Sequence, residues 1–292
     1  MKPLLGQLLV ERVTLTDGAL GTELQKRGLA AGELGDLWNL AHPERVEEVT
    51  RSYVEAGSRI VLTNTFRSNR VTLAGRGVPE KAADLNRAGA AVALRAAGDR
   101  ACVFGSIGPT GKLLMTGEVT PEEMVGAFVE QARALAEAGV HGIVIETMAD
   151  LEEARLAVVA ARRTGLPVAA CMVFDSGKNK DRTLMGATPE QAAEALSEAG
   201  ADIVGANCGQ GIAGYVPICR RLCAATDRPV WIKPNAGLPQ LVEGRTVYAG
   251  APEEFARCAP ELAQAGARFL GGCCGTTPDH IRALRQALAQ NQ

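Results

Sequence analysis

The stretch GGCCGTTP, residues 271–278, decides the fold class of this 292-residue sequence. The apolar residues before it, RFL at 268–270, predict a short strand. The residues after it predict a helix start, because a threonine cap, a proline in the first turn and an acidic residue suit the amino end of a helix. Two adjacent cysteines, Cys273 and Cys274, lie in the turn between strand and helix. On a regular strand their side chains would point to opposite faces, but the flanking glycines allow a bend that turns both thiols toward one point.

The same succession of strand, turn and helix recurs along the chain, and similar residues mark where each helix begins and ends. Six expected helix starts share a proline followed by an acidic residue, at Pro43, Pro79, Pro121, Pro189, Pro252 and Pro278. Four expected helix ends share an Ala-Gly pair whose glycine suits a left-handed cap, at Gly57, Gly139, Gly200 and Gly266. Eight short apolar runs predict strands at Val13–Thr16, Ile60–Thr63, Ala101–Phe104, Gly142–Ile145, Val168–Val173, Ile203–Gly205, Val230–Ile232 and Arg268–Gly271.

Strands that alternate with helices predict a parallel sheet whose apolar strands are buried on both faces. Eight such units favour an α/β fold, a (β/α)8 TIM barrel that forms a single domain over residues 1–292, and the alternative is an open, Rossmann-like sheet. The active site of such a barrel lies at the carboxyl ends of the strands. Polar and glycine-rich residues do follow the predicted strands, at 17–22, 63–66, 105–111, 146–147, 207–209, 234–237 and 273–274.

Composition and charge exclude several classes of partner. A net charge of −2 argues against nucleic acid and anionic membranes. Hydrophobic residues make up 47% of the chain, but no run of them is long enough to span a bilayer, and the amino terminus lacks a signal peptide. Eight cysteines without an export signal favour a cytoplasmic protein with free or metal-bound thiols over a disulfide framework.

Cys208, at the end of the predicted sixth strand, supplies a third thiol that can converge with Cys273 and Cys274 at the mouth of a barrel. Spacing alone leaves a metal site and plain core cysteines equally open, because adjacent cysteines are not a CxxC pair. Three thiolates around Zn²⁺ would make a poor Lewis acid for water but a good holder of a fourth thiolate, and coordination deprotonates a thiol whose usual pKa is about 8.5. The chemistry suggested is attack by a bound thiol on an electrophilic carbon.

The other five cysteines are expected to pack in the core and to have no catalytic role. They are Cys102, Cys171, Cys219, Cys223 and Cys258.

Seven segments, in this order, resemble the homocysteine S-methyltransferase family, and most closely the homocysteine-binding domain of its cobalamin-dependent methionine synthases. They are DGALGTEL (17–24), TNTF (63–66), GPTGK (108–112), IETMADL (145–151), NCG (207–209), KPNAGLP (233–239) and GGCCGTTPDHI (271–281). The resemblance implies a (β/α)8 barrel that holds zinc through Cys208, Cys273 and Cys274 and transfers a methyl group to homocysteine, giving methionine.

The resemblance also implies substrate-binding residues. The turn at Asp17, Gly18, Ala19 and Thr22 matches a motif for amino-acid binding, since a carboxylate can hold the substrate ammonium and exposed amides its carboxylate. On sequence alone, an ordinary strand-to-helix turn is the favoured explanation of this segment, because short glycine motifs match by chance.

Two further positions match residues of the family near the substrate. Glu146 is a second expected partner for the ammonium. The resemblance places Asn235 at the mouth and implies that its side-chain oxygen approaches zinc in the absence of substrate, although PNAG is also a strong turn sequence. Thr65 and Ser106 are candidates for lining the pocket.

The methyl donor remains open between two kinds of molecule. The synthases that this sequence resembles continue into further domains that bind folate and cobalamin, so we expect methylcobalamin or a separate corrinoid protein as donor. The segment KPNAGLP favours this reading over a small donor such as S-methylmethionine or betaine. Two further alternatives are an enzyme that methylates another thiol and a non-catalytic module in which zinc only links loops together.

His42, His141 and His280 lie away from the carboxyl ends of the strands, so no general base is expected.

Overall fold

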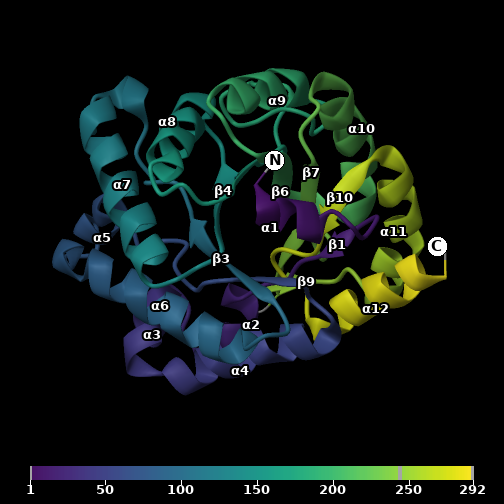
Figure 1. The fold of residues 1–292 in the computed structure, drawn as a ribbon, viewed down its shortest axis with the longest axis horizontal. Helices are drawn as coiled ribbons and strands as arrows, with labels where there is room; N and C mark the ends of the chain where they lie inside the picture. The colour runs from purple at the N-terminus through teal and green to yellow at the C-terminus, as the bar shows by residue number, and fades with distance from the viewer. Residues whose placement is uncertain (1, 243–244, 291–292) are drawn as a thin grey trace.

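All eight predicted strands are present in the computed structural model, which describes residues 2–242 and 245–290 (Figure 1). They are β1 (Thr14–Leu15), β2 (Ile60–Leu62), β3 (Cys102–Ile107), β4 (Gly142–Met148), β5 (Val168–Met172), β6 (Ile203–Gly211), β7 (Val230–Asn235) and β10 (Ala267–Leu270). Every neighbouring pair is parallel, in the order β1-β10-β7-β6-β5-β4-β3-β2. A parallel bridge between Thr16 and Ile60 joins the two ends of this order. The (β/α)8 barrel is therefore confirmed, and the open sheet is wrong.

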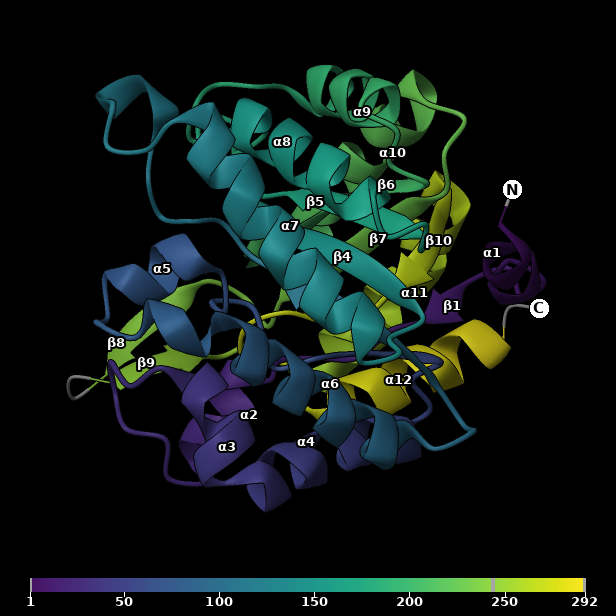
Figure 2. The same cartoon turned by 60° about the vertical axis from the view of Figure 1, so that its left-hand side comes forward.

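Helices surround the barrel on its outer face, as Figure 2 shows for α6, α7 and α8. The helices are α1 (Pro3–Leu8), α2 (Gly21–Lys26), α3 (Trp38–Ala41), α4 (Pro43–Ala56), α5 (Arg70–Ala74), α6 (Ala82–Ala97), α7 (Pro121–Glu137), α8 (Leu151–Arg162), α9 (Pro189–Glu198), α10 (Tyr215–Ala225), α11 (Pro252–Ala265) and α12 (Pro278–Ala289). All six predicted proline starts are confirmed; Pro79 begins a 3-10 turn, Pro79–Lys81, that leads into α6. The four predicted glycines at helix ends all have positive φ.

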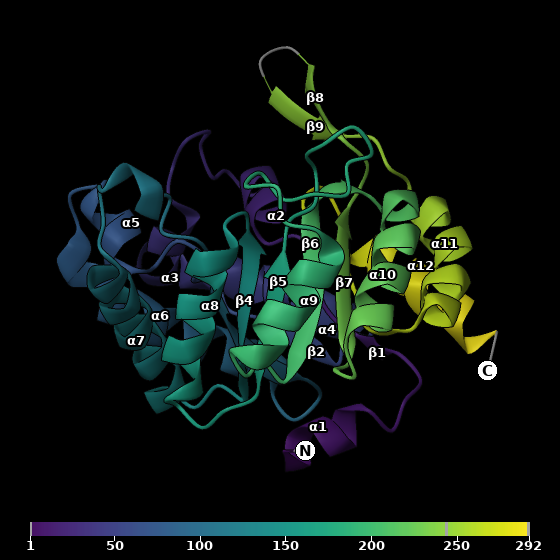
Figure 3. The same cartoon turned by 90° about the horizontal axis from the view of Figure 1, so that it is seen from above.

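The core has two layers that the barrel wall separates. One layer lies between strands and helices, and the other fills the barrel interior, where Phe104, Trp231 and Phe269 pack together. Leu5 and Leu8 of α1 belong to the interior layer, so this short helix closes the amino-terminal end of the barrel. Loops cover the opposite end of the barrel, where the carboxyl ends of the strands lie (Figure 3).

Four strands run further than the sequence predicts. The predicted ends at Phe104, Ile145, Gly205 and Ile232 become Ile107, Met148, Gly211 and Asn235 in β3, β4, β6 and β7. The ladder continues because polar side chains at these positions find hydrogen-bonding partners inside the mouth, as described below. The register shifts between Asn207 and Gly211 and between Ile145 and Met148, so the strand ends of β6 and β4 are irregular there.

The sequence did not predict the hairpin formed by β8 (Pro239–Val242) and β9 (Arg245–Tyr248). It follows β7 and projects from the end of the barrel opposite α1 (Figure 3). Its first strand is exposed along its whole length.

Candidate metal and substrate site

Three thiols converge at the carboxyl end of the barrel. The sulfur atoms of Cys208, Cys273 and Cys274 all lie within 4.8 Å of one another, although Cys208 comes from β6 and the other two follow β10. All three side chains are half-buried, so the cluster borders both protein and solvent. The predicted convergence is therefore present in the structure.

Backbone geometry explains how adjacent cysteines reach one point. The amide of Cys273 donates to the carbonyl of Pro234 at 2.7 Å, and the carbonyl of Cys274 accepts from the amide of Ala236 at 2.9 Å, which fixes the turn against the end of β7. A Cβ on Gly271 would lie 2.0 Å from Thr16 Oγ1. The sharp turn therefore depends on glycine before the cysteine pair.

Cys208 is held in a conformation that residues with a side chain seldom adopt. Its φ is +64°, and Thr147, across the mouth on β4, has a φ of +62°. The amide of Asn207 connects them: Oδ1 accepts from the backbone of Thr147 at 2.7 Å, and Nδ2 donates to Thr147 Oγ1 at 2.7 Å. The same Nδ2 lies 3.7 Å from Cys273 Sγ. Strained backbone of this kind clusters at functional sites, where the surrounding contacts hold it in place.

The three thiols share their protons unequally. Hydrogen bonds from the thiols of Cys273 and Cys274 lower the pKa of Cys208 to about 3. The same pairing raises the pKa of Cys273, and pairing with Cys208 raises the pKa of Cys274 to about 11.

The cluster fits a tetrahedral zinc ion. Zn–S bonds of about 2.3 Å at a tetrahedral angle separate two sulfurs by about 3.8 Å, and Cys208 Sγ lies 3.9 Å from Cys274 Sγ. Asn235 supplies a second indication, because its side chain is 2% exposed and its Oδ1 has no hydrogen-bonding partner among the described residues. A buried, unpaired oxygen beside the thiols is the kind of atom that a cation satisfies. The described residues offer no fourth cysteine or histidine within this cluster, so a bound metal would keep an open position.

Glu146 faces the mouth from β4 and is buried, with 9% of its surface exposed. Its Oε1 accepts from Ser106 Oγ at 2.6 Å, and its Oε2 lies 3.4 Å from Asn207 Nδ2. Burial raises the pKa of Glu146, an effect that the positive charge of Lys233 opposes. Glu146 is therefore not a solvated surface acid, and Ser106 lies beside it.

Asp17 forms an ion pair that the sequence reasoning missed. Lys233 Nζ lies 2.5 Å from Asp17 Oδ1, and the two side chains are 3% and 1% exposed. Asp17 Oδ2 accepts from the backbone amide of Leu62 at 2.7 Å. Lys233 lies two residues before Asn235 in a strand that is buried at every position, but the sequence alone does not show that its side chain points inward.

The glycine-rich turn after β1 contacts the cysteine turn directly. The amide of Ala19 donates to Thr276 Oγ1 at 3.1 Å, and Thr22 Oγ1 accepts from the amide of Gly275 at 3.3 Å. A Cβ on Gly18 would lie 2.7 Å from Thr276 Oγ1, so the two turns pack too closely for any larger residue. Their assignment to substrate binding stays a prediction.

The remaining cysteines and histidines have structural surroundings. The five other cysteines lie on strands or helices at the positions expected, on β3, β5, α10 and α11. Ring nitrogens of His141 and His280 hydrogen-bond to backbone groups, and His42 packs edge-on against Trp38. Thr65, the other predicted pocket residue, is fully buried and donates to the carbonyl of Ser106.

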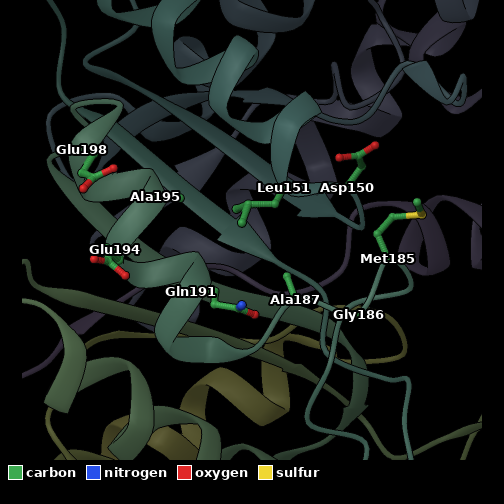
Figure 4. A pocket seen from close by; sticks show the side chains of 9 residues that line it. All are labelled: Asp150, Leu151, Met185, Gly186, Ala187, Gln191, Glu194, Ala195 and Glu198. Carbon is green, nitrogen blue, oxygen red and sulfur yellow. The ribbon is translucent and has the colours of Figure 1, made fainter. Parts of the chain in front are cut away.

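A separate open groove lies on the outer surface between α8 and α9 (Figure 4). It shares no residue with the thiol site. Its lining combines acidic side chains with small and apolar ones: Asp150, Leu151, Met185, Gly186, Ala187, Gln191, Glu194, Ala195 and Glu198.

Comparison with known proteins identifies the family. The sequence profile of homocysteine S-methyltransferases matches residues 14–288. The chain belongs to this family. Two methionine synthases, from Mycobacterium leprae (strain TN) and Mycobacterium tuberculosis (strain ATCC 25618 / H37Rv), are each 33% identical to it over 97% of its length. The chain spans only 25% of the length of these relatives.

Solved structures support the fold of this family member. The homocysteine methyltransferase MmuM from Escherichia coli, in its metallated form, superposes with a TM-score of 0.81 at 23% identity, covering 98% of this chain and 99% of that one. Its oxidized form gives a TM-score of 0.80 at 24% identity, over 98% and 99% of the two chains. Within the described residues, no helix is long and apolar enough to cross a membrane.

Proposed function

We propose that this chain is a zinc-dependent methyltransferase that moves a methyl group from a corrinoid carrier to homocysteine, giving methionine. The observation that carries the proposal is the cluster of Cys208, Cys273 and Cys274 at the barrel mouth, with sulfur spacing that suits zinc. Membership of the homocysteine S-methyltransferase family supports the acceptor. We also propose that the whole chain acts as one cytoplasmic domain, in keeping with its eight unbridged cysteines.

The three cysteines would hold Zn²⁺, which when bound keeps the thiol of a substrate ionised at neutral pH. The protein's own residues would orient that substrate. Asn207 holds the cysteine turn and Glu146 in a fixed relation through contacts to both, and Ser106 aligns the Glu146 carboxylate. In the transfer, the substrate sulfur forms the new bond to the methyl carbon, and the electrons of the broken bond leave with the donor. The substrate-binding residues proposed are Asp17, Gly18, Ala19, Thr22, Glu146 and Asn235.

Apolar side chains around the mouth favour a large donor over a small one. Most of the exposed large apolar residues in the described part of the chain lie on segments that follow β3, β5 and β7. They are Met115, Leu184, Met185, Leu238, Leu241, Val242 and Val247. Exposed apolar side chains on segments that follow strand ends are typical of a surface that another protein covers. A separate protein that presents methylcobalamin would cover it, whereas a small charged donor has no need of it.

A second candidate keeps the acceptor and replaces the donor with S-methylmethionine or betaine. The fold does not distinguish the two donors, because it is shared with another homocysteine methyltransferase, MmuM, over almost the full length of both chains. A corrinoid-dependent transfer to another thiol is a third reading, which competition between thiols would reveal.

The test is methyl transfer by the zinc-loaded protein, with methionine followed by mass spectrometry. We expect methylcobalamin and homocysteine to give methionine faster than in the absence of protein and faster than with a Cys273→Ser variant. Formation of methionine from S-methylmethionine or betaine without any corrinoid would establish the second candidate instead. Failure of the zinc-loaded protein to bind homocysteine would refute the acceptor.

A further inference from the structure

The imidazole of His280 hydrogen-bonds to backbone groups on two separate segments. The amide of Thr277 donates to Nδ1 at 3.1 Å, so Nδ1 carries no proton. The proton therefore lies on Nε2, which donates to the carbonyl of Gly250 at 3.0 Å. The side chain is buried and packs edge-on against Phe255, and its burial lowers the pKa of His280. One neutral tautomer thus joins the start of α12 to the segment that follows the β8–β9 hairpin.

These contacts belong to a closed circuit of hydrogen bonds that includes the cysteine turn. The amide of Gly250 donates to the carbonyl of Ala236 at 2.8 Å, and the amide of Ala236 donates to the carbonyl of Cys274 at 2.9 Å. Three residues after Cys274, the amide of Thr277 donates to His280. The circuit therefore passes from the cysteine turn to the two segments at the base of the hairpin, then through the imidazole and back to the turn.

The base of the hairpin, Ala236 and Gly250, packs closely against its surroundings. A Cβ on Gly250 would lie 2.5 Å from the carbonyl carbon of Ala236, and a Cβ on Gly275 would lie 2.2 Å from Tyr248 Cβ. Ala236 also follows Asn235 directly, and the side chain of Asn235 lies beside the thiols. Because these segments are in direct contact, a displacement of the hairpin base displaces the cysteine turn as well.

Other capping boxes of this barrel use a carboxylate or an amide where α12 has a histidine. Glu123 accepts from the amide of Thr120 at 2.9 Å at the start of α7, and Gln191 accepts from the amide of Thr188 at 2.9 Å at the start of α9. Such a box needs only an acceptor at this position. The donor at Nε2 is therefore what His280 adds to ordinary capping.

We propose that His280 is a positioning residue of the metal site, whose Nε2–H holds the base of the hairpin against the cysteine turn and so keeps Cys274 in place for zinc. Three successive hydrogen bonds link the imidazole to Cys274 through the backbone of Gly250 and Ala236. The inference rests on the proposed function, which makes zinc the metal of the three thiols.

The test compares two replacements of His280 that differ in one respect. His280→Gln retains an acceptor for Thr277 and a donor for Gly250, whereas His280→Glu retains only the acceptor. Competition with a coloured chelator at neutral pH gives the dissociation constant of zinc. We expect His280→Gln to stay within about threefold of the wild type and His280→Glu to bind zinc about tenfold more weakly, the lower end of the range for residues that support metal ligands. The added charge of glutamate attracts a cation, so charge alone predicts the opposite change.

A purely structural role for His280 predicts a different result. If the side chain only caps α12, glutamate and glutamine serve equally, and equal zinc affinities of the two variants would overturn the proposal. Gln191→Ala is the matched control, because it breaks the capping box of α9. It should lower the Tm of the metal-free protein and leave the zinc affinity unchanged. A loss of zinc affinity in this control as large as in His280→Glu would also overturn the proposal, since lower stability would then explain both.

A measurement on the wild type needs no variant. Since coupling between two sites is reciprocal, zinc must stabilise the hydrogen bond of His280 by the factor by which that bond tightens zinc binding. In protein with isotope-labelled histidine, NMR should show the Nε2 proton of His280 exchanging with water about tenfold more slowly when zinc is bound. An unchanged exchange rate would overturn the proposal. If the wild type binds no zinc, the proposed function itself fails, a result distinct from a wild type that binds zinc with variants of equal affinity.

Discussion

Replacing Cys273 with serine should remove the metal site and leave the barrel folded. Cys273 is one of only three thiols that converge in the described structure, so the variant keeps two sulfur ligands. Loss of a residue that merely supports a ligand lowers metal affinity about 10- to 100-fold. Loss of a ligand itself should therefore cost at least about 100-fold, or about 2.7 kcal/mol of binding free energy.

The same loss should appear in thermal stability. At a free zinc concentration of about 100 times the wild-type dissociation constant, zinc stabilises the folded protein by about 2.7 kcal/mol. In Cys273→Ser the same zinc concentration at most equals the new dissociation constant, and the stabilisation falls to about 0.4 kcal/mol. The difference of about 2.3 kcal/mol corresponds to at least about 4 °C in Tm for a chain of this size.

Two assays check this prediction at one buffered concentration of free zinc. Elemental analysis gives the zinc content per chain, and thermal unfolding with and without zinc gives the shift in Tm. Cys102→Ser is the control, because this half-buried thiol begins β3 at the far end of the barrel. The reasoning is refuted if Cys273→Ser retains one zinc per chain with a wild-type shift in Tm, or if Cys102→Ser loses its zinc as well.

Three further predictions follow from single contacts. Asn207→Ala should lower zinc affinity about 10- to 100-fold, since its amide lies 3.7 Å from Cys273 Sγ; competition with a coloured chelator measures this, and wild-type affinity would contradict it. Burial raises the pKa of Glu146 in the folded state, so folding favours its neutral form. This contribution to the free energy of unfolding is fully present below the unfolded-state pKa and is lost as pH rises through the folded-state pKa. Urea unfolding should therefore show Glu146→Gln gaining stability over the wild type as pH rises above the unfolded-state pKa of a glutamate, about 4.3, and parallel profiles would speak against it. Tyr53→Phe should lose about 1–3 kcal/mol in urea, because its buried hydroxyl donates to the carbonyl of Ala19 at 2.9 Å; a change below about 0.5 kcal/mol would show that the contact contributes little.

The sequence predicted most of the fold because local signals and the barrel agree. Prolines at helix starts and glycines at helix ends mark where each element changes, and those positions depend on backbone conformation alone. The hairpin of β8 and β9 escaped prediction because the residues of β8 are exposed and the segment lacks a clear alternation of apolar and polar positions. The closing role of α1 was missed for a different reason: its burial depends on contacts with strands far away in the sequence.

The parts of the candidate site that could be predicted are those that residue type and position in the sequence identify. The cysteines follow predicted strands, and the acid follows an apolar run. The pairing of Lys233 with Asp17 could not be predicted, because the two residues lie 216 positions apart and nothing local shows that the lysine points inward. The same holds for Asn207, whose amide hydrogen bonds depend on the irregular ends of β4 and β6.

Asn207 also gives a physical reason to expect that metal and substrate bind cooperatively. One amide lies 3.7 Å from Cys273 Sγ and 3.4 Å from Glu146 Oε2, so the position of the cysteine turn and that of the carboxylate depend on each other. A metal that fixes the three thiols also fixes this amide, and with it the anion proposed to receive the substrate ammonium. Since coupling between two sites is reciprocal, homocysteine must then raise the affinity for zinc by the same factor by which zinc raises the affinity for homocysteine. Glu146 lies on β4 and Asn207 on β6, and the cysteine turn is hydrogen-bonded to the end of β7, so the coupling passes between strand ends and needs no movement of the surrounding helices.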